Sequence, residues 1–275
     1  MSQGLITAGI DIGSTTSKAV LWMDDHLGPC VIGPSTTNPR GTAHECYERV
    51  LALAGISAAE VGYIVGTGYG RTKVTFANEN VSEISAHGRG AQKLLPSART
   101  IIDIGGQDTK VILLDGRGQI VEYVMNDKCA AGTGRFLDFI ARTLGIEVDK
   151  LPALHMDGEY RPVRLSSMCS VFIESEVINL INDEVPLPSV VQGLHQSVAV
   201  RVAALVKRVG LTEDLVVTGG VAKNAGIIDA LERSLGIKMK ALAEFADPQV
   251  VGGLGAAVIA REIYLKRGNK STDPV

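Results

Sequence analysis

A short pattern occurs twice in this chain, and it limits the possible folds more than any other feature. Residues 9–21 and 101–113 both contain Ile-Asp-Ile-Gly, four variable positions and a lysine followed by apolar residues. In each copy, apolar runs flank a polar, glycine-containing turn, which is typical of a β-hairpin. A repeated supersecondary unit indicates an internal duplication. The sequence therefore predicts an α/β protein with two similar halves.

Hydrophobic periodicity predicts the elements around these hairpins. The hairpin strands are expected at 5–10 with 18–23 and at 100–104 with 111–114. Glycine turns and capping residues separate the other elements. Further strands are expected at 61–66, 118–125, 163–165 and 215–218, and helices at 42–54, 82–95, 136–144, 172–182, 189–209, 225–235 and 250–263. The predicted domains are 1–98 and 99–275, with the C-terminal helix as a candidate addition to the first.

The two hairpin turns have the chemistry of a nucleotide triphosphate site. Glycines allow backbone N–H groups to approach phosphate oxygens, and hydroxyls and a lysine add donors and charge. The aspartates at the matching strand ends, Asp11 and Asp103, are expected to hold a hydrated Mg²⁺ through water. The alternative is that each Asp-Ile-Gly is only a tight turn. The predicted phosphate-binding residues are Gly13, Ser14, Thr15, Thr16, Lys18, Gly105, Gly106 and Gln107.

A later glycine turn has the features of a binding site for the nucleoside part of the nucleotide. Gly219 and Gly220 follow a predicted buried strand, and Asn224 precedes a helix. Such a turn lets a flat ring lie against the backbone, so these three residues are predicted to bind adenosine. The glycines at 66–70 lack the Gly-x-Gly-x-x-Gly spacing and, followed by Arg71, are interpreted as an ordinary functional or structural turn.

Two of the four cysteines share a sequence setting. Cys129 and Cys169 each precede a helical pattern and are predicted to lie where a helix begins, whereas Cys30 and Cys46 are interpreted as buried apolar thiols. Unpaired N–H groups and a partial positive charge at a helix start favour a thiolate. The sequence therefore suggests that Cys129 and Cys169 are metal ligands. The cysteine spacing does not suggest structural disulfides.

Composition excludes several classes of function. The net charge of −3 argues against nucleic acid as a main partner, which clustered Lys and Arg would hold. No apolar run approaches the length of a membrane span, and the N-terminus lacks the pattern of a secretory signal. We therefore expect a cytoplasmic protein without membrane or nucleic-acid partners.

Several segments together resemble one family. The two Asp-Ile-Gly hairpins and the late Thr-Gly-Gly are similar to the actin, sugar-kinase and heat-shock chaperone superfamily. Within it, four segments resemble the activators of 2-hydroxyacyl-CoA dehydratases, which are related to the ATP-binding subunits of benzoyl-CoA reductase. These segments are Asn-Asp-Lys-Cys-Ala-Ala-Gly-Thr-Gly-Arg-Phe (126–136), Ile-Asp-Ile-Gly-Gly-Gln-Asp (102–108), Gly-Tyr-Gly-Arg (68–71) and Cys-Ser-Val-Phe-Ile-Glu-Ser-Glu (169–176).

The resemblance implies a fold, two cofactors and a partner. It implies two duplicated ribonuclease-H-like domains of the actin-like ATPase fold around a nucleotide cleft. It also implies a homodimer with one 4Fe–4S cluster per dimer, and two cysteines from each copy would supply the usual four thiolates. ATP hydrolysis would then drive an electron from a ferredoxin or flavodoxin to an acceptor dehydratase or reductase that carries its own iron–sulfur cluster.

The same resemblance suggests how the two sites are coupled. Gln107 is the candidate for orienting the attacking water, with Asp103 and Asp11 as the other candidate catalytic residues. Gly132 and Gly134, shortly after Cys129, are expected to reach the nucleotide, so that nucleotide turnover would move the thiolate.

Three alternatives remain at this point. A small-molecule kinase of the same superfamily would share the phosphate and adenosine turns, and a regulatory ATPase of the chaperone branch would share the fold. Within the family, the acceptor could instead be a benzoyl-CoA reductase or a double-cubane cluster protein.

Overall fold

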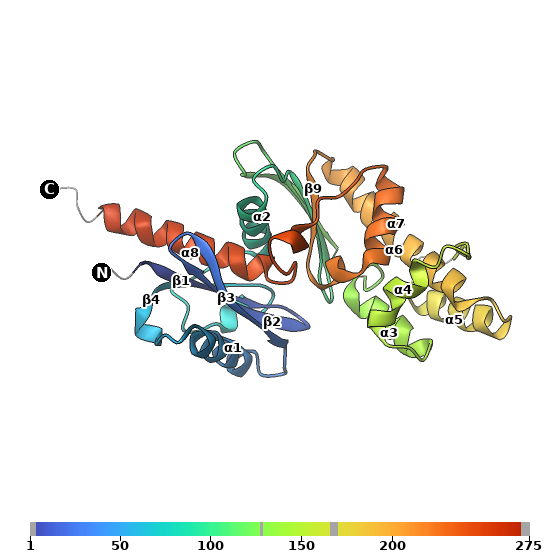
Figure 1. Ribbon diagram of the computed structural model, residues 1–275, viewed down its shortest axis with the longest axis horizontal. Coiled ribbons are helices and arrows are strands. Elements are labelled where there is room, and N and C mark those ends of the chain that lie inside the picture. The colour runs from blue at the N-terminus through green and yellow to red at the C-terminus, as the bar shows by residue number, and fades with distance from the viewer. Residues whose placement is uncertain (1–3, 127–128, 166–169, 271–275) are drawn as a thin grey trace. The chain divides into compact units, whose positions relative to one another are not determined.

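The structure is a computed structural model that describes residues 4–126, 129–165 and 170–270. Within these ranges the chain divides into two compact units. The first unit comprises Met1–Ala98, Leu114–Ile120 and Leu242–Val275, and the second comprises Arg99–Leu113 and Val121–Ala241. The C-terminal segment therefore returns to the first unit, as the course of the chain in Figure 1 shows.

The first unit is built on a five-stranded sheet with the order β3-β2-β1-β4-β5. The first three strands form an antiparallel meander, and β4 and β5 are added parallel to β1. The strands are β1 (Ile6–Ile12), β2 (Thr16–Met23), β3 (His26–Pro34), β4 (Val61–Thr67) and β5 (Glu79–Asn80).

Helices cover both faces of this sheet because its strands are apolar on both sides. Ile10 and Leu21 pack with Val50 of α1 (Pro39–Ala54) on one face. On the other face, Val20 packs with Leu254 of α8 (Val251–Lys270), and α2 (Glu83–Leu94) packs beside α8. Figure 1 shows α1 and α8 on opposite sides of the blue strands. Short 3₁₀ turns lie at Ala58–Glu60, Arg71–Lys73 and Leu242–Glu244.

The close packing of α8 depends on glycine. A Cβ on Gly9 of β1 would lie 1.9 Å from the carbonyl oxygen of Gly253, and a Cβ on Gly255 would lie 1.8 Å from that of Ala86. Only a residue without a side chain allows these backbones to approach so closely. The small residues near the start of α8 therefore hold that helix directly on β1 and α2.

The second unit repeats the strand order of the first. Its sheet has the order β8-β7-β6-β9, which matches β3-β2-β1-β4. Lys240 forms a single parallel bridge to Val216 of β9, where the first unit has β5. The duplication seen in the hairpin sequence thus extends to the topology of the sheet. The strands are β6 (Thr100–Ile104), β7 (Thr109–Leu114), β8 (Ile120–Asn126) and β9 (Leu215–Thr218).

The second unit differs from the first by the helices between β8 and β9. Phe136 and Ile140 of α3 pack with Leu194 of α6 and Ile104 of β6 in one apolar core. The helices are α3 (Gly134–Thr143), α4 (Leu151–His155), α5 (Ser170–Asn182), α6 (Leu187–Val209) and α7 (Ala225–Leu235), with 3₁₀ turns at Val148–Lys150 and Gly220–Lys223. This helical insertion carries the Cys129 segment.

Most predicted elements are confirmed, with boundaries shifted by a few residues. The predicted strand at 163–165 is wrong, because this segment packs on α6 and not on a sheet. The Val163 N–H donates to the carbonyl oxygen of Ser189 at 3.1 Å, and a Cβ on Gly193 would lie 2.4 Å from the Val163 carbonyl oxygen. Among the described residues, no helix combines the length and apolar character that crossing a membrane requires.

Candidate functional site

The first hairpin turn places a buried ion pair beside a glycine. The Gly13 N–H donates to the carbonyl oxygen of Thr16 at 3.2 Å, which closes the turn, and the Ser35 hydroxyl donates to the Gly13 carbonyl oxygen at 2.7 Å. Lys18 Nζ lies 3.3 Å from Asp11 Oδ2, and Asp11 is buried. Ser14 and Thr16 are half-buried, whereas Thr15 is exposed at the tip of the turn.

The second hairpin turn has the same construction. The Gly105 N–H donates to the Asp108 carbonyl oxygen at 3.0 Å. Lys110 Nζ lies 3.3 Å from Asp103 Oδ2, and the Thr218 hydroxyl donates to Asp103 Oδ1 at 3.0 Å. Gly106 is half-buried and Gln107 is exposed at the tip of this turn, in the place that Thr15 occupies in the first.

The two turns belong to a four-residue constellation that occurs once in each unit. Asp11 pairs with Lys18 on β2 and with Thr67 on β4, and Asp103 pairs with Lys110 on β7 and with Thr218 on β9. A glycine with positive φ follows each threonine, namely Gly68 at 85° and Gly219 at 86°. A Cβ on Gly68 would lie 2.3 Å from Asp11 Oδ1, and one on Gly219 would lie 2.8 Å from Asp103 Oδ1.

Thr67 and Gly68 are residues that the sequence analysis missed as parts of a site. The sequence predicts only an ordinary functional or structural turn at 66–70, because the dinucleotide spacing is absent there. A comparison of the two halves beyond the hairpins would have found them, since in both halves a threonine ends a parallel strand and a glycine follows it. The absence of a side chain at Gly68 and Gly219 therefore lets the backbone pack directly against the two buried carboxylates.

The residues present fit a magnesium ion held through water. Thr218 donates to one oxygen of Asp103 and Lys110 to the other, and a carboxylate can accept about four hydrogen bonds in all. Mg²⁺ keeps several waters and takes one or two carboxylates together with substrate phosphates. In the described ranges, no group of three or more His, Cys, Asp or Glu side chains forms an all-protein metal cage.

Helix α3 is hydrogen-bonded to the second turn. The Gly134 N–H donates to the Gly105 carbonyl oxygen and the Arg135 N–H donates to the Gly106 carbonyl oxygen, both at 2.9 Å. The Thr109 hydroxyl donates to the carbonyl oxygen of Gly132 at 2.8 Å. The first N–H groups of a helix have no partner within the helix. At α3 the carbonyls of the glycine turn satisfy two of them.

The predicted position of Cys129 at a helix start is wrong. Helix α3 begins at Gly134 with Thr133 as its N-cap, so Cys129 lies outside the first turn of the helix. The effect of the helix dipole is strongest within that first turn. Cys129 is exposed, and the Asn126 side-chain amide donates to its carbonyl oxygen at 3.1 Å. Cys169 lies outside the described residues, and α5 begins at the next position.

The other two described thiols are less accessible. Cys46 is buried and Cys30 is half-buried, and burial raises the pKa of both thiols. A raised pKa favours the thiol over the thiolate that binds metal. Among the described cysteines, Cys129 is therefore the one that is exposed enough to bind a metal centre shared with another chain.

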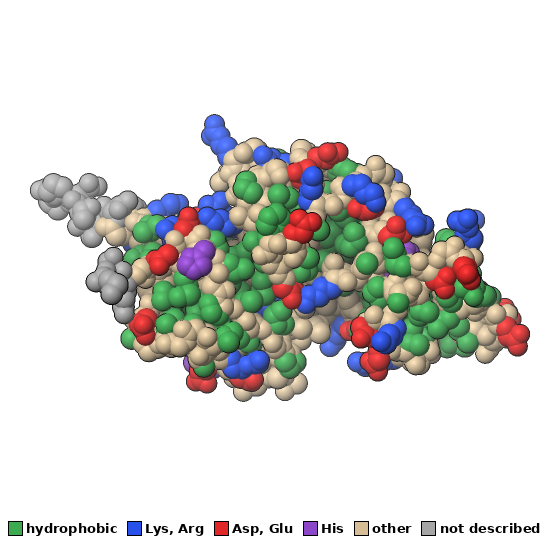
Figure 2. Space-filling model, in the orientation of Figure 1, with side chains coloured by type: hydrophobic (Ala, Val, Ile, Leu, Met, Phe, Trp, Pro, Cys, Tyr) green, Lys and Arg blue, Asp and Glu red, His purple; other side chains and the backbone are tan. Residues whose placement is uncertain are grey.

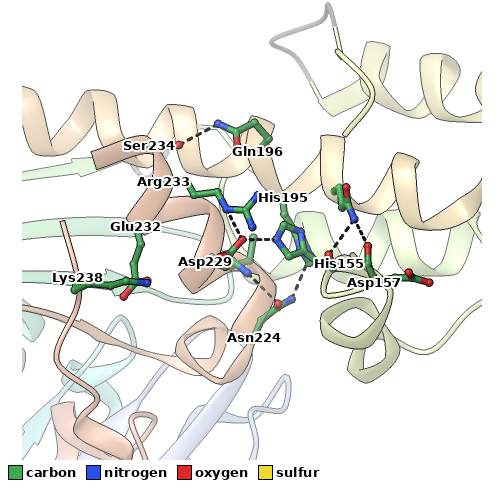
Figure 3. A network of polar contacts seen from close by, with 12 residues as sticks. His155, Asp157, His195, Gln196, Asn224, Asp229, Glu232, Arg233, Ser234 and Lys238 are labelled. Atoms are coloured by element: carbon green, nitrogen blue, oxygen red, sulfur yellow. Dashed lines mark hydrogen bonds and ion pairs between the residues drawn. The ribbon is translucent and has the colours of Figure 1, made fainter. Parts of the chain in front are cut away.

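The predicted adenosine turn rests on a buried polar network. Asn224 caps α7 by accepting from the Ile227 N–H at 3.1 Å, and its amide lies 3.3 Å from Nε2 of His195. Figure 3 shows His195 beside His155, whose Nε2 lies 3.0 Å from Asp229 Oδ2. The Asn224 side chain therefore orients the turn from within the protein. Gly219 is buried, whereas Gly220 is exposed.

His195 is neutral at ordinary pH. Its side chain is fully buried on α6, and its ring centroid lies 4.9 Å from that of His155. Burial, followed by the charge of His155, lowers the pKa of His195 to about 3. A neutral imidazole can accept at Nε2, which matches the amide of Asn224 on that side.

The repeated topology, the two Asp-Lys turns and the later Gly-Gly turn define an ATPase of the actin-like fold. The chain belongs to the BadF/BadG/BcrA/BcrD ATPase family, whose model matches residues 8–260. The resemblance stated from the sequence is thereby confirmed.

Relatives are similar over nearly their whole length. The activator of lactoyl-CoA dehydratase from Anaerotignum propionicum is 42% identical over 268 residues, covering 96% of this chain and all of that protein. A benzoyl-CoA reductase component from Thauera aromatica is 35% identical, covering 92% of each chain. The solved structure of the activator of 2-hydroxyisocaproyl-CoA dehydratase from Clostridium difficile, with bound ADPNP, has a TM-score of 0.91 and 39% identity, covering 98% of this chain and 99% of that one.

Proposed function

We propose that this protein hydrolyses ATP to deliver a low-potential electron to a 2-hydroxyacyl-CoA dehydratase. The phosphates of ATP would be held by the residues of the two hairpin turns, with Mg²⁺ held through water by Asp11 and Asp103. Gln107, exposed at the tip of its turn, would orient the attacking water. Gly219, Gly220 and Asn224 would hold the adenosine.

The observation that carries this proposal is the pair of hydrogen bonds from α3 to the second turn. A change in the turn on loss of the γ-phosphate would alter the bonds from Gly134 and Arg135 to Gly105 and Gly106. Because Cys129 lies five positions before the first residue of α3, a shift of this helix would be passed directly to the thiolate. A nucleotide-dependent element that is linked through the chain to a redox ligand is the physical requirement for coupling.

We further propose that two copies of the chain share one 4Fe–4S cluster, held by Cys129 and Cys169 of each copy. Such a cluster supplies one-electron transfer at low potential. Cys129 is exposed, which fits a ligand shared with a second chain. Figure 2 shows hydrophobic surface over the end of the second unit that holds α3 and α5 in Figure 1. Large hydrophobic side chains are exposed on these two helices. They are Phe139, Phe172, Ile178 and Ile181, with 41–66% of each residue accessible.

The energetic demand on ATP can be bounded. Lowering the potential of a one-electron couple by about 300 mV requires about 7 kcal/mol, since about 59 mV corresponds to a tenfold change in the equilibrium constant. This energy must come from nucleotide binding and hydrolysis that favour one arrangement of α3 over another. The electron would come from a ferredoxin or flavodoxin.

The acceptor is proposed to be a dehydratase with an iron–sulfur cluster of its own. Support comes from the higher identity to the lactoyl-CoA dehydratase activator, 42%, than to the benzoyl-CoA reductase component, 35%. Reduced protein with ATP and Mg²⁺ is expected to activate such a dehydratase, whereas the same protein with a non-hydrolysable ATP analogue is not. Activation that is equal with the analogue would contradict coupling to hydrolysis.

The cluster is tested by anaerobic reconstitution with iron and sulfide, followed by metal analysis and measurement of mass in solution. We expect about four irons per dimer in the wild-type protein, and loss of that iron in Cys129→Ser and Cys169→Ser. Cys30→Ser is the matched control, because that thiol is half-buried and should not affect iron content. A metal-free monomer that phosphorylates a sugar would refute the proposal and favour a kinase.

A further inference from the structure

The two hairpin turns differ in charge although their backbones match. Thr16 and Asp108 hold equivalent positions, because the carbonyl oxygen of each accepts the N–H of the turn glycine. In the first turn Lys18 is 3.3 Å from one carboxylate, that of Asp11. In the second turn Lys110 Nζ is 3.3 Å from Asp103 and 2.8 Å from Asp108. Only the second lysine therefore bridges two carboxylates among these turn residues.

Two of the three members of this bridge are almost completely removed from water. The side chains of Lys110 and Asp103 are each 4% exposed and that of Asp108 is 22% exposed, whereas Lys18 is 12% exposed. A buried ammonium or carboxylate is unfavourable unless it is paired and hydrogen-bonded. Lys110 is held between two carboxylates, so its charge is already compensated within the protein. Lys18 faces a single carboxylate and is the more exposed of the two lysines, so it is the better candidate for contacting a phosphate.

The position of Asp108 connects this ion cluster to the turn. Its backbone oxygen closes the turn at Gly105, and its Oδ1 lies 2.7 Å from the point that a Cβ on Gly105 would occupy. The carboxylate therefore folds over the glycine while Lys110 anchors it from the strand. Gln107 precedes Asp108 directly, so the conformation of Gln107 depends on this anchor.

We propose that Lys110 is a positioning residue for ATP hydrolysis. By its charge it holds Asp103 and Asp108 together and so fixes the turn that presents Gln107, while Lys18 meets the nucleotide. This inference rests on the proposed hydrolysis of ATP at these turns. The two lysines of the duplicated hairpins then have different roles: Lys18 binds the nucleotide, and Lys110 holds the second turn in place.

A charge-balanced set of variants tests the proposal. The cluster of Lys110, Asp103 and Asp108 carries one net negative charge when both carboxylates are ionised. Lys110→Met raises the number of net negative charges on the cluster to two, and Asp108→Asn lowers it to zero. The double variant restores the single negative charge of the wild-type cluster. Steady-state ATP hydrolysis gives kcat and KM for each variant, and circular dichroism verifies that each is folded.

The expected pattern is specific to charge. Lys110→Met should lower kcat by more than about tenfold because it takes the shared cation away from two carboxylates, whereas its KM for ATP should change less than about threefold. The double variant should recover at least about fivefold in kcat relative to Lys110→Met, although it has lost more contacts. Lys18→Met should instead raise KM.

The outcomes separate this inference from the proposed function. Wild-type kcat in Lys110→Met would overturn the inference, and so would a folded double variant that stays as slow as Lys110→Met, because packing alone would then account for the loss. Absence of ATP hydrolysis by the wild-type protein would overturn the proposed function as well. Wild-type hydrolysis with the expected order of variants supports both.

Discussion

Acid should destabilise this protein through the buried histidine behind the predicted adenosine turn. In the folded chain the pKa of His195 is lowered to about 3, mainly by burial and further by the charge of His155. In the unfolded chain an ordinary histidine has a pKa of about 6.5. Between these values the unfolded state binds a proton that the folded state does not. The contribution of His195 is therefore constant above about pH 7 and falls with pH below it.

The magnitude follows from these two values. Lowering the pH from 7.5 to 5.0 should cost about 2 kcal/mol of folding free energy through His195 alone. This is a large part of the stability of a typical domain. We expect His195→Gln to remove this dependence, because the amide does not titrate.

The assay is urea denaturation followed by circular dichroism at both pH values. The wild-type protein should lose about 2 kcal/mol more than His195→Gln between pH 7.5 and 5.0. His26→Gln is the control, because His26 is exposed on β3 and its replacement should leave the wild-type pH dependence in place. If wild-type and His195→Gln proteins lose equal stability on acidification, burial of a neutral His195 is refuted.

Three further predictions concern the turns. Gln107→Ala should slow ATP turnover by more than about tenfold with little change in nucleotide affinity, measured by single-turnover hydrolysis and calorimetry, and equal loss of both would contradict a water-orienting role. Gly219→Ala should destabilise the fold by about 1–3 kcal/mol, because its φ of 86° and ψ of 177° suit only glycine; an unchanged urea midpoint would contradict this strain. Gly68→Ala should weaken ATP binding, since its Cβ would lie 2.3 Å from Asp11 Oδ1, and unaltered affinity would exclude this turn from the site.

The parts of the structure that depend on local pattern could be predicted well. Apolar runs broken by Asp-Ile-Gly form the hairpins β1–β2 and β6–β7, and Asn224 ends its turn by capping α7. In each case a few consecutive residues contain the whole physical cause, namely strand periodicity, a glycine turn or a side chain that accepts from a helix N–H.

Prediction was wrong where a neighbour distant in sequence decides the structure. The segment at 163–165 has strand-like residues, yet its backbone is bonded to α6. The cysteine at 129 precedes a helical pattern, yet the helix begins only at Gly134, where the carbonyls of a turn almost 30 positions earlier accept its first N–H groups. Sequence periodicity carries no information about such partners.

The sequence by itself determined that the chain has two glycine hairpins with an aspartate and a lysine each, because strand and turn preferences act over a few residues. Only the tertiary structure decided that Thr67 and Thr218 pair with Asp11 and Asp103, that Lys110 bridges two carboxylates and that α3 is bonded to the second turn. These relations depend on the register of parallel strands and on buried polar groups finding partners across the fold. That pairing is set by packing of the whole unit and not by neighbouring residues.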